Sequence, residues 1–155
     1  MLLEYRNMHI KGILRAEISI IKIAIDFVLN VLPSKIYNII ITKSEKFGLS
    51  LDGTLGYLDT NSNIYILRRE HNKDDGSWLS TLVHELAHVK QVEEGRFDIK
   101  STVFSNNVDD HAQAWYEVEA NFTQLRFRQK HESERLCEDS YFVKTYSNMG
   151  IWAGV

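Results

Sequence analysis

The amino-acid sequence predicts a small α+β domain. Apolar residues recur at helical spacing before the only proline and again in two later segments, whereas short runs rich in β-branched and aromatic residues lie between them. The 155 residues, 44% of them hydrophobic and 25% charged, suffice for one sizeable core, and no proline-rich or low-complexity linker divides them. We therefore expect a single domain over residues 1–155.

The first expected element is an N-terminal helix that ends at Pro33. Segment 18–32 is very apolar, but Lys22 and Asp26 interrupt it and lie on the face opposite to the apolar residues. The segment is shorter than a membrane span, and it lacks the basic start and the cleavage pattern of a secretory signal. We expect a core helix and no membrane partner.

A small, twisted and mostly antiparallel sheet is expected next. Residues 36–42 form a short β-branched run bounded by charged residues, which is typical of a buried strand. Residues 55–59 and 63–68 alternate in polarity on either side of the polar turn 60–62. This pattern indicates an antiparallel hairpin.

The following helix carries the most informative feature of the chain, the segment His84-Glu85-Leu86-Ala87-His88. Residues four apart lie on the same face of a helix, so both imidazoles can reach one metal ion. Glu85 is rotated from that shared axis, which lets its carboxylate meet a metal-bound water instead of the ion. Apolar residues at helical spacing over 78–91 support the helix, and Gly95 is a stop signal. The spacing indicates two ligands and one general base.

A third ligand is needed because catalytic zinc usually takes three protein ligands and leaves a fourth position for water. A second long helix is predicted from about 110 to 134, and it carries Glu117 as the strongest candidate. Asn121 shares the face of Glu117, so its side-chain oxygen is suited to accept a hydrogen bond from a ligand imidazole. Glu119 lies about 200° around the helix from Glu117, so both cannot face the metal. Glu119 and His111 remain alternatives for the third ligand.

These two helices resemble those of the gluzincins, zincin metallopeptidases in which a His-Glu-x-x-His helix is followed by a helix with a Glu-x-x-x-Asp pattern. The resemblance is local and covers residues 84–88 and 117–121. The residue pattern there is similar to that of minimal gluzincins and of IrrE/ImmA-like repressor-cleaving peptidases. It implies a zincin-like fold in which His84, His88 and Glu117 bind Zn²⁺. Glu85 would be the catalytic base that activates a zinc-bound water for attack on a peptide carbonyl. The family often has aspartate where this chain has Asn121.

The expected function is that of a zinc metallopeptidase, an endopeptidase or amide hydrolase acting on a peptide or protein. The resemblance also implies that an extended substrate adds to an outer strand, for which Asn63–Arg68 is the matching segment. One alternative is a non-catalytic peptide-binding module on a zincin scaffold. A second is a SprT-like, DNA-associated protease with His111 as the third ligand.

Net charge and cysteine content narrow these possibilities. The formal net charge of −3 disfavours a nucleic-acid surface, since such domains usually carry a marked basic excess. Cys137 is the only cysteine, so an intramolecular disulfide and a multi-cysteine zinc finger are excluded. A single cysteine is typical of proteins in the reducing interior of the cell, so we expect a cytoplasmic protein.

Overall fold

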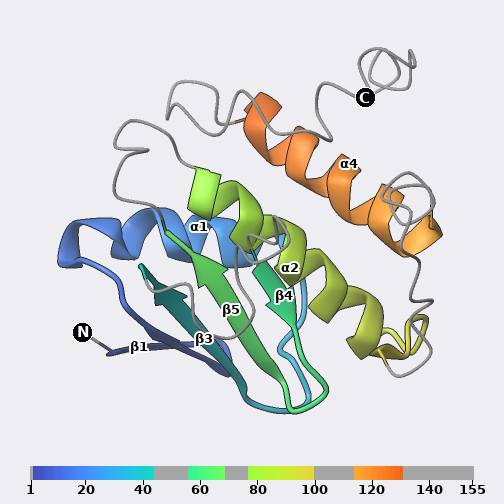
Figure 1. Ribbon diagram of the computed structural model, residues 1–155, viewed down its shortest axis with the longest axis horizontal. Coiled ribbons are helices and arrows are strands. Elements are labelled where there is room, and N and C mark those ends of the chain that lie inside the picture. The colour runs from blue at the N-terminus through green and yellow to red at the C-terminus, as the bar shows by residue number, and fades with distance from the viewer. Residues whose placement is uncertain (1, 44–55, 69–76, 100–113, 131–155) are drawn as a thin grey trace.

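The computed structural model describes residues 2–43, 56–68, 77–99 and 114–130 and confirms the α+β class (Figure 1). The described elements, in chain order, are β1 (Leu2–Tyr5), β2 (Met8–Lys11), a 3-10 turn (Arg15–Glu17), α1 (Ile18–Val28), β3 (Tyr37–Thr42), β4 (Gly56–Leu58), β5 (Asn63–Leu67), α2 (Ser77–Glu93) and α4 (Trp115–Lys130). None of the helices in these ranges combines the length and the apolar character needed to cross a bilayer.

The five strands form one mixed sheet in the order β1-β2-β3-β5-β4. The outer pairs, β1 with β2 and β4 with β5, are antiparallel, and the expected hairpin of β4 and β5 is confirmed. The central pairs, β2 with β3 and β3 with β5, are parallel. Helix α1 provides the crossover that a parallel connection from β2 to β3 requires.

The first hairpin, β1 with β2, was missed by the sequence prediction, which began with a helix. Its register pairs Tyr5 with Met8, so the turn consists of Arg6 and Asn7 alone. Both turn residues have positive φ angles, 48° and 60°, as the type I′ turn of a two-residue hairpin requires. The usual Asn-Gly or Asp-Gly signal for such a turn is absent, and for this reason the hairpin was not recognised.

One face of the sheet carries the core. Residues of neighbouring strands that share this face stand opposite one another, as Met8 with Tyr37 and Ile39 with Ile64 show. Helices α1 and α2 cover this face, and α4 packs on α2 (Figure 1). The buried strand side chains are Met8, Ile10, Tyr37, Ile39, Ile41, Ile64 and Ile66.

Helix α1 is shorter than the predicted run to Pro33. It ends at Val28, because Leu29 adopts an extended backbone with ψ of 102°. The Arg6 side chain donates a hydrogen bond to the Leu29 carbonyl at 3.0 Å and so satisfies a backbone group beyond the helix end. Val31 and Leu32, which fall within the predicted helical run, are 69% and 63% exposed.

Two glycines have positive φ angles, but only one of them, Gly12, packs closely against a neighbouring strand. A Cβ on Gly12 (φ +87°) would lie 1.9 Å from the Ile41 carbonyl oxygen, whereas one on Gly95 (φ +72°) would meet nothing within 4 Å. We expect Gly95→Ala to lower the free energy of unfolding by about 1 kcal/mol, through backbone strain alone. Gly12→Ala should cost roughly 3 kcal/mol or more, because the backbone must also move. Urea unfolding of both variants checks this, and equal losses would contradict it.

Candidate metal centre

Helix α2 carries two different faces. Its apolar side chains, such as Leu82 and Leu86, are fully buried in the core, while His84 and His88 point to the opposite side, toward α4. The two imidazoles lie 4.9 Å apart between ring centroids and are inclined at 83°. The expected pair of histidines on one helical face is therefore present.

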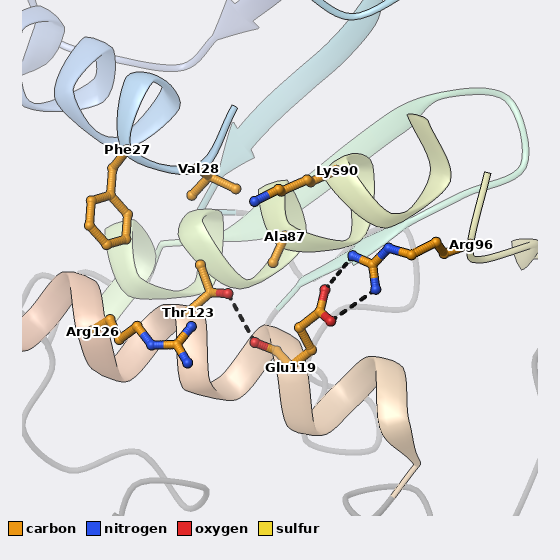
Figure 2. Close-up of a pocket in the computed structure, with 8 residues that line it drawn as sticks. All are labelled: Phe27, Val28, Ala87, Lys90, Arg96, Glu119, Thr123 and Arg126. Atoms are coloured by element: carbon orange, nitrogen blue, oxygen red, sulfur yellow. Dashed lines mark hydrogen bonds and ion pairs between the residues drawn. The ribbon is translucent and has the colours of Figure 1, made fainter. Parts of the chain in front are cut away.

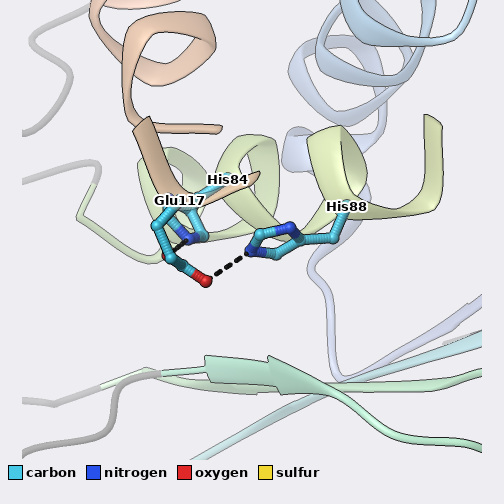
Figure 3. Close-up of side chains that lie close together, drawn as sticks. All are labelled: His84, His88 and Glu117. Atoms are coloured by element: carbon cyan, nitrogen blue, oxygen red, sulfur yellow. Dashed lines mark hydrogen bonds and ion pairs between the residues drawn. The ribbon is translucent and has the colours of Figure 1, made fainter. Parts of the chain in front are cut away.

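Glu117 lies in the first turn of α4, which packs along α2. An acidic side chain is favourable there because the N-terminal end of a helix carries a partial positive charge. Its carboxylate oxygens lie 3.0 Å from His84 Nε2 and 3.0 Å from His88 Nε2 (Figure 3). One ligand atom from each of these three side chains lies within 4.8 Å of the other two. Glu117 is thus the carboxylate that the structure brings to the histidines.

This donor set fits a divalent metal ion. Two imidazole nitrogens and one carboxylate oxygen are a combination found at zinc sites. Bonds of about 2.0–2.1 Å in a tetrahedral arrangement separate two ligand atoms by roughly 3.3 Å. Each Nε2 lies 3.0 Å from a different oxygen of the Glu117 carboxylate, Oε2 for His84 and Oε1 for His88, and the three ligand atoms lie within 4.8 Å of one another, so the side chains would have to adjust around the ion. A His-His-Glu group that could hold a metal ion is therefore present.

The pKa values of His88 and Glu117 are shifted in opposite directions. Burial by itself would lower the pKa of His88, but its hydrogen bond to Glu117 and the charges of Glu85 and Glu117 outweigh burial and raise the pKa to about 9. Burial would raise the pKa of Glu117, but hydrogen bonds to His84 and His88 hold it well below its usual range. Without a metal, His88 is therefore a cation at neutral pH.

Metal binding should release the His88 proton, since zinc binds the neutral imidazole. Because the pKa of His88 is raised to about 9, most metal-free molecules carry the proton at pH 7. We expect about one proton to be released per zinc ion at pH 7 and the apparent affinity to rise roughly tenfold per pH unit up to about pH 9. Titration calorimetry in buffers of different ionisation enthalpy measures the release. A heat of binding independent of the buffer would contradict the prediction.

Glu85, the expected general base, is 5% exposed and follows the first histidine directly. Its charge contributes to the raised pKa of His88, so its carboxylate lies near the group of ligands. Glu85 is nevertheless not one of the three side chains that converge on a common point. This placement agrees with the sequence pattern, which separates the roles of ligand and base.

The expected role of Asn121 is not observed. Asn121 is 1% exposed, but its amide oxygen accepts no hydrogen bond from either ligand imidazole. Instead, Gln91 Oε1 lies 2.9 Å from His88 Nδ1. The sequence prediction missed Gln91, although its position three residues after His88 on the same helix was a usable signal.

Comparisons of the chain with protein-family models, curated proteins and solved structures find no match. The geometry of the site therefore carries the functional argument.

The two alternatives for the third ligand have different outcomes. Glu119 turns away from the histidines and forms two hydrogen bonds with Arg96, at 2.7 and 3.0 Å. The alternative in which Glu119 is the third ligand is therefore wrong. Glu119 lies about 200° around the helix from Glu117, because the two positions are two residues apart. His111 lies outside the described residues.

Arg96 reaches Glu119 because α2 ends in a tight turn at Gly95. The N–H groups of Gly95 and Arg96 donate to the carbonyls of Val92 and Gln91, at 3.0 Å each. This pair of bonds and the positive φ of Gly95 define a Schellman motif, which confirms the predicted stop signal. The turn directs the chain back toward α4.

A cleft of about 380 Å³ lies between α1, α2 and α4, beside the Arg96–Glu119 ion pair (Figure 2). Its lining residues are Phe27, Val28, Ala87, Lys90, Arg96, Glu119, Thr123 and Arg126. None of the three converging side chains contributes to it, so the cleft is separate from the candidate metal centre.

Proposed function

We propose that this protein is a zinc-dependent metallopeptidase, an endopeptidase or amide hydrolase. The observation that carries the proposal is the convergence of His84, His88 and Glu117 beside the buried carboxylate of Glu85. The local resemblance to gluzincins adds support, because the residue types at 84–88 and at 117 are those that the family carries on its two site helices.

Each residue would have a separate role. A zinc ion held by His84, His88 and Glu117 would supply an acidified water and a positive charge for the developing oxyanion. The Glu85 carboxylate would accept a proton from the attacking water and later give it to the nitrogen of the leaving amine. Burial of Glu85 keeps bulk water from competing for that proton.

The proposed substrate-binding edge is β4, which replaces the segment Asn63–Arg68 in this role. Strand β5 (Asn63–Leu67) pairs with β3 on one side and with β4 on the other, so the prediction of β5 as an outer strand was wrong. Among the described residues, β4 is the strand at one edge of the sheet, and it contacts α2. An extended peptide could add to its outer side through main-chain hydrogen bonds.

The test combines metal content with turnover. We expect the purified protein to contain about one zinc ion per chain, as three-ligand catalytic sites do. It should cleave an unfolded protein, lose this activity with a chelator and regain it with added zinc. Zinc without cleavage of any unfolded protein would support the non-catalytic binding module, in which the metal is structural or absent. Absence of bound metal would contradict the metallopeptidase.

A further inference from the structure

Gln91 connects one candidate ligand with the helix that carries another. Its side chain is completely buried. Its oxygen Oε1 lies 2.9 Å from His88 Nδ1, and its nitrogen Nε2 donates to the Tyr116 carbonyl at 2.9 Å and to Glu119 Oε1 at 3.3 Å. Gln91 thus joins α2 to the first turns of α4.

These contacts determine which way the Gln91 amide points. The Tyr116 carbonyl and the Glu119 carboxylate only accept hydrogen bonds, so the amide nitrogen must face them. The amide oxygen must then face His88, and it too can only accept. His88 therefore carries a proton on Nδ1, which leaves Nε2, the atom nearest Glu117, as the one that can bind a metal.

Arg96 and Glu119 in turn hold the amide. The guanidinium of Arg96 donates to both oxygens of Glu119 (Figure 2). One of them, Oε1, also accepts from Gln91, so Arg96 holds the carboxylate that Gln91 contacts. Glu119 is partly exposed, whereas Gln91 is not, so the chain of contacts runs from the surface to the buried ligand. Each contact restricts the next, as the outer partners of metal-binding histidines generally do.

We propose that Gln91 is a positioning residue that fixes the Nδ1–H tautomer and the ring orientation of His88 for metal binding, and that Glu119 and Arg96 hold it in place. The inference rests on the metal centre of the proposed function, but not on peptidase activity. An amide from the helix of the histidines thereby takes the role that we expected Asn121 to have.

The first test compares two buried glutamines that both join α2 to α4. Gln91→Leu should weaken zinc binding roughly 10–100-fold, the usual effect of losing such a partner. Gln124 donates to Ser80 Oγ at 2.6 Å and not to a candidate ligand. Gln124→Leu should therefore lower the unfolding temperature but leave zinc affinity within about twofold. Competition with a chromophoric chelator measures the affinity, and thermal unfolding of the metal-free proteins measures the stability.

The second test reads the tautomer directly in the wild type and does not depend on the folding of a variant. Long-range ¹H–¹⁵N spectra of the zinc-loaded protein should show His88 with its proton on Nδ1. A metal-bound Nδ1, or a Gln91→Leu variant with unchanged zinc affinity, would overturn the role of Gln91 alone. A wild type that binds no zinc would overturn the metal centre and this inference together.

Discussion

Glu85→Gln should abolish peptide hydrolysis while zinc remains bound. Glutamine preserves the shape of the side chain, and the three candidate ligands, His84, His88 and Glu117, are unchanged. The amide cannot accept a proton from the attacking water, so we expect kcat to fall on the order of 10²–10⁴-fold, the typical contribution of a general base. Metal analysis and hydrolysis of an unfolded protein are the two measurements.

Glu93 provides the matched control on the same helix. Its carboxylate accepts hydrogen bonds from Ser34 Oγ at 2.7 Å and Tyr37 Oη at 3.1 Å, away from the candidate ligands. Glu93→Gln should keep both zinc and activity, with at most a modest loss of stability. Full activity in Glu85→Gln would remove the proposed base, and loss of zinc in that variant would give Glu85 a different role.

Glu117→Ala should remove zinc from the protein. The carboxylate contacts both imidazoles and so connects α4 with the two histidines of α2. Its loss should reduce affinity by more than the roughly 10–100-fold that follows from losing an outer hydrogen-bond partner. Hydrolysis should fall with the metal content.

Glu119→Ala removes the same charge two positions later on α4 and serves as the control. Glu119 contacts Arg96 and Gln91 and not the imidazoles, so zinc affinity should fall by no more than in Gln91→Leu. His111→Ala should retain zinc. Zinc loss in His111→Ala with retention in Glu117→Ala would reverse the assignment of the third ligand.

Short-range patterns in the sequence predicted much of the site. The spacing of His84, Glu85 and His88 depends only on helix geometry, which one turn of sequence already encodes. Glu117 was predicted because it is an acidic residue on the next long helix, and the packing of α4 on α2 brings its carboxylate to the histidines. The α+β class followed from the alternation of helical and strand-like periods in the same way.

Long-range relations could not be predicted in this way. The role of Gln91 depends on a backbone carbonyl of Tyr116 and on the carboxylate of Glu119, neither of which any pattern around His88 reveals. The inner position of β5 depends on its parallel pairing with β3, which local alternation in 63–68 does not specify. Periodicity identifies an element, but its neighbours are decided by packing of the whole chain.

The ligands come from two helices, and His84 and Glu117 stand 33 positions apart in the chain. An ion bound to both would close a loop of that length, as a covalent cross-link does. For a loop of this size, the reduction in unfolded-chain entropy corresponds to roughly 4 kcal/mol. A chain with a single cysteine cannot form an intramolecular disulfide. The metal ion would therefore be the cross-link that stabilises the packing of α4 on α2.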